Sequence, residues 1–204
     1  MTAEALTVSD VAIERGGHRL LAGLSFTLTA GELAIAQGPN GSGKTTLLRA
    51  LAGLSPPATG AIEYNGRAVY DAARAGESPV IYSGHAEGLK AELTVTENLA
   101  FYRALWESDA DIAAALERIG IAHCAGRLVR ELSAGQRRRA SLARILLSSA
   151  RIWILDEPFT NLDSDGRALI VELVGECLAG GGLVVIASHL TGEFADQVAL
   201  TIAL

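Results

Sequence analysis

GPNGSGKT, at residues 38–45, decides the fold of this chain, because it matches the pattern GxxxxGK[ST] at every fixed position. A short apolar run, Leu33–Ala36, leads straight into it, and Thr45–Ala52 has the composition of a helix. Glycines let backbone N–H groups converge on phosphate oxygens, and a helix N-terminus adds a favourable dipole. The order strand, glycine-rich loop, helix therefore predicts a phosphate-binding loop.

Two residues of this loop carry charge or metal chemistry. Lys44 supplies a point positive charge for the β and γ phosphates, and the Thr45 hydroxyl can coordinate magnesium. We therefore expect ATP and Mg²⁺; the alternative, an ordinary glycine-rich turn, does not explain the flanking strand and helix. The residues expected at the nucleotide are Gly38, Pro39, Asn40, Gly41, Ser42, Gly43, Lys44, Thr45 and Thr46.

The rest of the chain alternates strand and helix patterns. Short apolar runs predict strands, and the stretch of about 88–150 is mostly helical. Short connections between the elements favour a mostly parallel sheet. We predict an α/β fold of the P-loop NTPase (RecA-like) type over 1–204, a single nucleotide-binding domain with an inserted α-helical subdomain and an N-terminal antiparallel β region. The predicted strands are Leu6–Glu14, Leu24–Leu28, Leu33–Ala36, Val80–Tyr82, Ile152–Leu155 and Leu183–Ile186.

The net charge and composition limit the kinds of partner and compartment that we expect. The 204 residues carry 17 Lys and Arg against 23 Asp and Glu, so the net charge of −6 argues against nucleic acid as a partner. The two cysteines, Cys124 and Cys177, form no CxxC pair and suit a reducing compartment. No secretory signal is visible, and no apolar stretch reaches the roughly 18 residues that span a bilayer. We expect a cytoplasmic protein, soluble or held at a membrane by a partner.

Acidic and imidazole side chains follow two predicted strands. Asp156 and Glu157 come directly after Ile152–Leu155, and His189 follows Leu183–Ala187. Ligands of open parallel sheets bind beyond the carboxyl ends of the strands. We expect Asp156 to hold magnesium, Glu157 to deprotonate the attacking water, and His189 to contact the γ-phosphate or position Glu157. A solvated turn or a surface histidine is the alternative for each.

The segment Leu132–Gln136 reads LSAGQ and opens a helix. Ser133 is a good N-cap, and Gly135 leaves the first N–H groups open to a large anion. For the basic run Arg137–Arg139 we expect a solvated helix face. Likewise Thr94 and Glu97 fit a capping box at the start of another helix.

Taken in order, the motifs resemble the ATP-binding subunits of ABC transporters. They are GPNGSGKTT (38–46), LSAGQ (132–136), ILDEP (154–158), NLD (161–163) and SH (188–189). The resemblance implies a head-to-tail pair of subunits, working with integral membrane transporter subunits. In such a pair Ser133, Gly135 and Gln136 of one copy would contact the nucleotide held by Lys44 of the other. Asp163 would cross the dimer interface.

A closer resemblance is to the ATPase of the haem exporter-type complex of bacterial cytochrome c maturation. It is carried by Gly23–Leu33, Thr45–Gly60, Tyr82–His85, Glu92–Tyr102, Leu132–Arg144 and Trp153–Asp163. The resemblance implies a peripheral subunit at the cytoplasmic face of the bacterial inner membrane that delivers or releases haem. The surface from His85 to Tyr102 would dock the membrane subunits. No direct haem binding is expected, because the chain has no CxxCH.

Two positions depart from the usual ABC pattern. His85 stands where most members carry Gln, which makes it a candidate for the magnesium-bound water or for relaying the partner's movement. Arg15 stands near the place of the aromatic that stacks on adenine, and either stacks there or lies in a solvated turn.

Two other functions share parts of this pattern. An ABC ATPase for a different substrate, such as an ion, lipid or drug, would have the same chemistry and another membrane partner. A soluble ABC protein acting on ribosomes or DNA usually has two ATPase units or a long coiled-coil insertion, and this sequence has neither.

Overall fold

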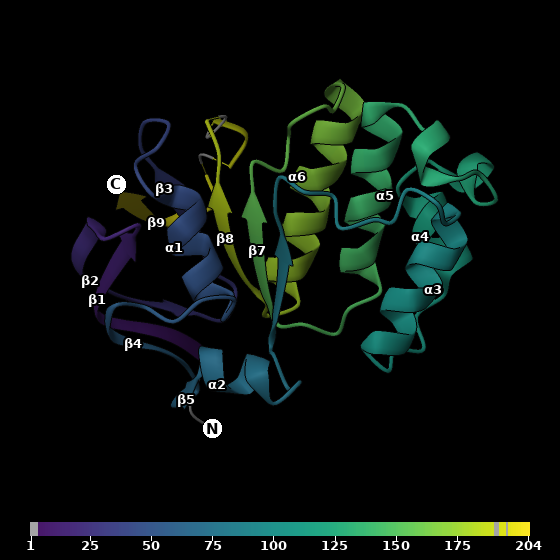
Figure 1. Ribbon diagram of the computed structural model, residues 1–204. Helices are drawn as coiled ribbons and strands as arrows, with labels where there is room; N and C mark the ends of the chain where they lie inside the picture. The colour runs from purple at the N-terminus through teal and green to yellow at the C-terminus, as the bar shows by residue number, and fades with distance from the viewer. Residues whose placement is uncertain (1–3, 190–191, 195) are drawn as a thin grey trace. The chain divides into compact units, whose positions relative to one another are not determined.

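A five-stranded parallel sheet, in the order β6-β7-β8-β3-β9, carries the predicted phosphate loop (Figure 1). The structure is a computed structural model that describes residues 4–189, 192–194 and 196–204, apart from the side chain of Arg15. Apolar runs make β7 and β8 strands covered on both faces, as predicted. The strands are β6 (Val80–Ser83), β7 (Ile152–Asp156), β8 (Leu183–Ala187), β3 (Leu33–Gln37) and β9 (Val198–Ala203).

The edge strand β9 was not predicted. Its residues alternate between exposed and partly buried positions, with only Ile202 fully buried, so it lacks the apolar run that marks β7 and β8. It is a strand because β3 gives it a parallel partner from Leu33↔Val198 to Gln37↔Ala203.

A second, antiparallel sheet has the order β2-β1-β4-β5 and confirms the predicted N-terminal β region. Gly16 and Gly17, with φ of +58° and +78°, form the turn between its two long strands. Its strands are β1 (Ala5–Arg15), β2 (His18–Thr29), β4 (Thr59–Tyr64) and β5 (Arg67–Ala68), and α2 (Val69–Arg74) follows.

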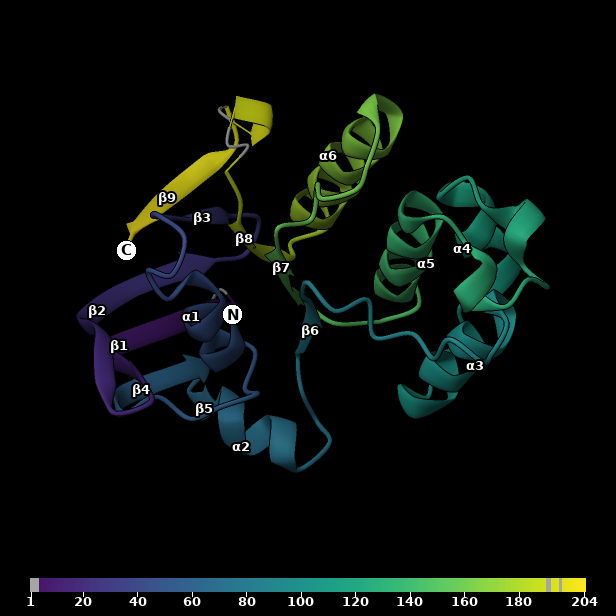
Figure 2. The ribbon, with the colours of Figure 1, turned by 45° about the horizontal axis from the view of Figure 1, so that its top comes forward.

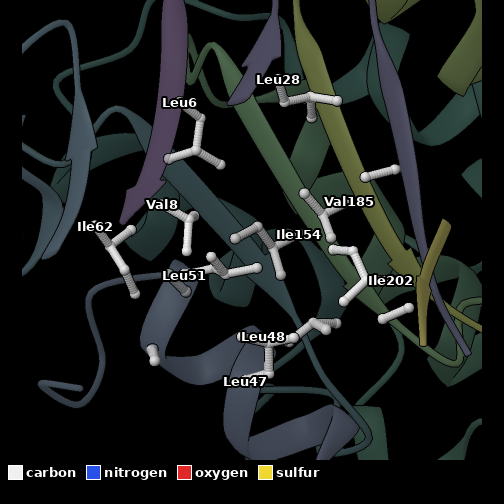
Figure 3. Close-up of a cluster of buried hydrophobic side chains, with 14 of the residues drawn as sticks. Leu6, Val8, Leu28, Leu47, Leu48, Leu51, Ile62, Ile154, Val185 and Ile202 are labelled. Carbon is white, nitrogen blue, oxygen red and sulfur yellow. The ribbon is translucent and has the colours of Figure 1, made fainter. Parts of the chain in front are cut away.

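Helix α1 (Lys44–Leu51) joins the two sheets into one core. Leu47, Leu48 and Leu51 are fully buried, and Figure 3 shows them among side chains of both sheets. Each buried leucine contributes roughly 1.5–3 kcal/mol. The start of α1, and with it the phosphate loop, is therefore fixed by the core. The sheet residues labelled in that cluster are Leu6, Val8, Leu28, Ile62, Ile154, Val185 and Ile202.

The middle of the chain is helical (Figure 2). It has its own apolar core. Thr94 and Glu97 form the predicted capping box at the start of α3, and Asp111 caps α4. The helices are α3 (Val95–Leu105), α4 (Ile112–Arg118), α5 (Ala134–Leu146) and the first part of α6 (Ser164–Ala179), with 3₁₀ turns η1 (Ala122–Cys124) and η2 (Val129–Glu131); a third turn, η3 (Gly192–Phe194), precedes β9.

The chain divides into two compact units. The first comprises Met1–Gly84, Ala150–Pro158 and Leu173–Leu204, and the second comprises His85–Ser149 and Phe159–Glu172. The helical region expected at about 88–150 falls within the second unit, which also includes the later segment Phe159–Glu172. That these units make up one nucleotide-binding domain stays a prediction.

The prediction that Arg137–Arg139 form a solvated face of α5 is wrong. Arg138 is only 3% exposed. Arg137 donates to the carbonyl of Leu132 at 2.7 Å, and Arg139 donates to the carbonyl of Ile119 at 3.1 Å. Helix α5 contacts both α3 and α4. A guanidinium can be buried where carbonyls and carboxylates accept its N–H groups.

No helix within the described ranges is long and apolar enough to cross a membrane.

Candidate active site

The phosphate loop is shaped by close packing around its first glycine. A Cβ on Gly38 would lie 2.6 Å from the carbonyl oxygen of Leu204 and 2.7 Å from Oγ of Ser42, so no larger residue fits. At the other end Gly43, with φ of +105°, is the N-cap of α1 and gives it no side-chain hydrogen bond. The first N–H groups of α1 are therefore left for another acceptor.

Lys44 lies folded over this loop. Its buried ammonium donates to the carbonyl oxygens of Gly38 at 2.6 Å and Pro39 at 3.0 Å. An ammonium has three N–H donors, so these two bonds hold the charge at the loop and leave one donor over.

The phosphate loop also contains the hydroxyl of Ser42. Its Oγ is buried and has no hydrogen-bond partner among the described residues. Because buried hydroxyls are nearly always paired, this atom indicates that the loop accepts a polar ligand. Thr45 and Thr46, both partly buried in the first turn of α1, complete the predicted set here.

Asp156, at the carboxyl end of β7, is only 1% exposed. Its Oδ2 accepts a hydrogen bond from the hydroxyl of Tyr82 at 3.2 Å. Burial, followed by the nearby Asp156 carboxylate, raises the pKa of the Tyr82 phenol, so the hydroxyl keeps its proton. The sequence does not predict this contact, because Tyr82 and Asp156 lie 74 positions apart.

Glu157 follows in an unusual backbone conformation. Its φ is +48°, in the left-handed region, and its N–H donates to the carbonyl of Ala187 at 2.8 Å. The bond to the end of β8 fixes this turn, and the side chain is mostly buried, with 16% exposed. Strained backbone of this kind is frequent at functional sites.

His189 brings two of the predicted segments together. Its Nε2 lies 3.0 Å from Oδ1 of Asn40 in the phosphate loop and 3.5 Å from Oε1 of Glu157. An imidazole, a carboxylate and the phosphate loop thus meet beyond the carboxyl ends of β3, β7 and β8, where parallel sheets bind ligands.

The LSAGQ segment lies in the second unit. Ser133 is the predicted N-cap of α5, and Gln136 completes a capping box by accepting from the Ser133 N–H at 3.0 Å. This role of Gln136 was not predicted, although the spacing S-x-x-Q is typical of a capping box. A cavity of about 390 Å³ opens beside the segment; its lining includes Ser133, Gly135, Gln136, Arg139, Asn161 and Asp163.

Asp163 is fixed beside this cavity. Its Oδ1 accepts from the Gly166 N–H at 2.9 Å and from Arg139 at 2.8 Å. These two bonds, that of Gly166 first, lower the pKa of the Asp163 carboxyl, so it stays ionised.

Two predicted residues remain. His85 is exposed at the start of the second unit. The side chain of Arg15 lies outside the described part of the structure. The site residues thus fall into two groups: the phosphate loop, Asp156, Glu157 and His189 in the first unit, and His85, Ser133, Gly135 and Gln136 in the second. Their roles stay predictions.

Comparison with known proteins supplies the family. The model of the ABC transporter family matches residues 21–160. The chain is similar to the cytochrome c biogenesis ATP-binding export protein CcmA of Ruegeria pomeroyi, with 48% identity over 91% of this chain and 85% of that protein. It is 44% identical to CcmA of Paracoccus denitrificans, over 91% of this chain and 82% of that one.

A solved structure agrees on the fold. The ATP-binding subunit of an ABC transporter superposes with a TM-score of 0.88 over 98% of this chain and 85% of that chain, at 24% identity. With the family match over residues 21–160 and the identity to CcmA proteins, this chain belongs to the ABC transporter family, as an ATPase of the cytochrome c biogenesis type.

Proposed function

We propose that this chain hydrolyses Mg²⁺–ATP as one half of a head-to-tail dimer, and that the dimer drives the membrane subunits of a haem exporter-type complex in c-type cytochrome biogenesis. The observation that carries the proposal is the contact of His189 with both Asn40 and Glu157, which gathers a base, an imidazole and the phosphate loop at one sheet edge.

ATP fits the residues of the loop. Among the described residues, one N–H of Lys44 and the Ser42 hydroxyl have no hydrogen-bond partner, and the start of α1 has no side-chain cap. Together these groups offer donors and positive charge to the phosphates.

Magnesium fits the same edge. Asp156 is a buried carboxylate whose only hydrogen bond from the described residues comes from Tyr82, and such a group needs a cation or further donors. Asp156 and the Thr45 hydroxyl are the residues that would hold the ion, and His85 is a third candidate through a bound water. When bound, Mg²⁺ neutralises charge on the β and γ phosphates.

In ATP hydrolysis, Glu157, His189 and Lys44 each have one proposed role. A water oxygen attacks the γ-phosphorus, the bond to ADP breaks, and the Glu157 carboxylate accepts the proton of the water. His189 donates through Nε2 to the γ-phosphate or holds Glu157 in place. Lys44 stabilises the negative charge that the transferring phosphoryl group carries.

The second copy supplies the other face of the nucleotide. Ser133 is exposed at the start of α5. Among the described residues, only the Asn161 carbonyl would lie within 4 Å of a Cβ at Gly135, at 3.2 Å. Together with Gln136 they present a helix N-terminus that suits a γ-phosphate. Asp163, held by Gly166 and Arg139, would reach the partner copy.

Helix α3 offers an apolar surface for the membrane subunits. Phe101 and Leu105 are 51% and 61% exposed, although both are large apolar side chains. Exposed patches of this kind often mark partner sites. Docking there would hold the chain peripherally at the cytoplasmic face of the inner membrane. Haem would pass through the membrane subunits and not contact this chain.

Deletion of the gene tests the biological role. We expect loss of c-type cytochromes on haem-stained gels with b-type cytochromes unchanged, rescue by the wild-type gene, and no rescue by Glu157→Gln. Intact c-type cytochromes in the deletion strain would remove the role in cytochrome biogenesis and leave the ATPase standing.

A further inference from the structure

Tyr82 lies on the strand next to Asp156, on the same face of the sheet. In the parallel pairing of β6 with β7, Tyr82 is opposite Ile154, two residues before Asp156. Side chains two residues apart on a strand share a face, so the phenol lies diagonally across from the carboxylate. The result is the 3.2 Å hydrogen bond from the Tyr82 hydroxyl to Oδ2 of Asp156.

The phenol is held firmly by its surroundings. Its ring packs against the buried cluster that contains Ile154, Val185 and Leu48, so the hydroxyl is presented from a fixed ring. Asp156 is buried and receives no other hydrogen bond from the described residues. Oδ2 of Asp156 therefore accepts a hydrogen bond within the protein, whereas Oδ1 accepts none from the described residues.

We propose that Tyr82 is a positioning residue for magnesium: it fixes the Asp156 carboxylate through Oδ2 so that Oδ1 faces the ion or one of its waters. The inference rests on the proposed function, since it needs Asp156 to act at the magnesium. Hydrogen-bond partners of metal ligands orient the ligand, and their loss typically costs 10- to 100-fold in metal affinity or activity. A purely structural Tyr82 would instead contribute only ring packing.

Tyr82→Phe separates these roles, because it keeps the ring and removes the hydroxyl. The binding of a fluorescent ATP analogue is measured first with EDTA and then during a Mg²⁺ titration. We expect unchanged affinity in EDTA and a rise of about 10-fold in the Mg²⁺ concentration for half-maximal enhancement of binding. The Mg²⁺ concentration for half-maximal hydrolysis should rise in parallel, with kcat near wild type at saturating Mg²⁺.

Tyr64→Phe is the matched control. The Tyr64 hydroxyl also donates to a carboxylate, Oε2 of Glu4 at 2.7 Å, but in the antiparallel sheet. Its Mg²⁺ titration should equal that of the wild type. Asp156→Asn shows how large the effect is when the carboxylate proposed to hold Mg²⁺ is lost entirely.

Two results would overturn the inference. One is a Mg²⁺ titration of Tyr82→Phe that matches the wild type while Asp156→Asn is impaired. The other is an equal loss of affinity with EDTA and with Mg²⁺, which marks a structural role. A wild-type protein whose ATP binding ignores Mg²⁺ would instead contradict the proposed function itself.

Discussion

The imidazole Nε2 of His189 lies 3.0 Å from the amide oxygen Oδ1 of Asn40, so a single side-chain contact joins the end of β8 to the phosphate loop 149 residues earlier. Because the amide oxygen is an acceptor, it favours the tautomer with the proton on Nε2. In that tautomer the Nε2–H is also the group that would donate a hydrogen bond to a γ-phosphate oxygen.

Removal of this imidazole should slow hydrolysis without weakening binding. We expect His189→Ala to lower kcat by about 100-fold or more, with little change in ATP affinity, because proton-handling and positioning groups contribute at this level. In the double variant with Asn40→Ala, the loss should be no greater than in His189→Ala alone, since contacting residues are not additive. If the fold losses in kcat of the two single variants multiplied in the double variant, in steady-state assays, the coupling between His189 and Asn40 would be contradicted.

The caps of α5 and α3 allow stability and activity to be separated. Ser133→Ala and Thr94→Ala each remove a hydroxyl that accepts a backbone N–H at a helix start, from Gln136 and Glu97 respectively. Each should cost about 1 kcal/mol in denaturant unfolding.

Only Ser133→Ala should also reduce ATP hydrolysis, because Ser133 is proposed to meet the nucleotide of the partner copy. Ser133→Thr keeps the cap and should recover stability. Equal activity of the two alanine variants would rule out a direct role of Ser133 in the reaction.

The first glycine of the loop should not tolerate a methyl group. Gly38→Ala places Cβ 2.6 Å from the backbone oxygen of Leu204, which cannot move aside as a side chain would. We expect a stability loss of about 1–3 kcal/mol and at least a 10-fold loss of ATP affinity.

Gly76→Ala is the control for backbone strain. Gly76 has φ of +78°, but no atom of the described residues would lie within 4 Å of a Cβ there, so Gly76→Ala should cost about 1 kcal/mol and leave ATP binding unchanged. Similar ATP affinities for both variants in fluorescence titrations would show that the packing at Gly38 does not shape the loop.

The thiol of Cys177 should react slowly. Burial raises its pKa to about 11, so it is protonated at pH 7–8, and the thiolate is the reactive form. Alkylation of Cys177 by iodoacetamide should accelerate as the pH rises toward 11. Rapid alkylation of the native protein at pH 7.5, followed by peptide mass spectrometry, would contradict this environment.

Local patterns predicted most of the fold, and long-range pairing explains what they missed. The apolar run of β7 and the phosphate loop before α1 are readable from neighbouring residues. The bond between Tyr82 and Asp156 depends on the register of two strands 74 residues apart, which no local pattern encodes. The burial of Arg138 is a result of tertiary packing, because its neighbours in the sequence predict an exposed helix face. Gln136 differs, because its capping role follows a local spacing and could have been predicted.

The role of Glu157 tests the account most directly. For the wild type and for Glu157→Gln, the rate of ATP hydrolysis is measured, and the molar mass in the presence of Mg²⁺ and ATP is measured by light scattering. We predict that the variant binds ATP, loses hydrolysis by at least 100-fold and accumulates as a dimer, because the nucleotide is held between two copies and no base removes the proton of the water. Hydrolysis at the wild-type rate, or a variant that stays monomeric with ATP bound, would contradict the account.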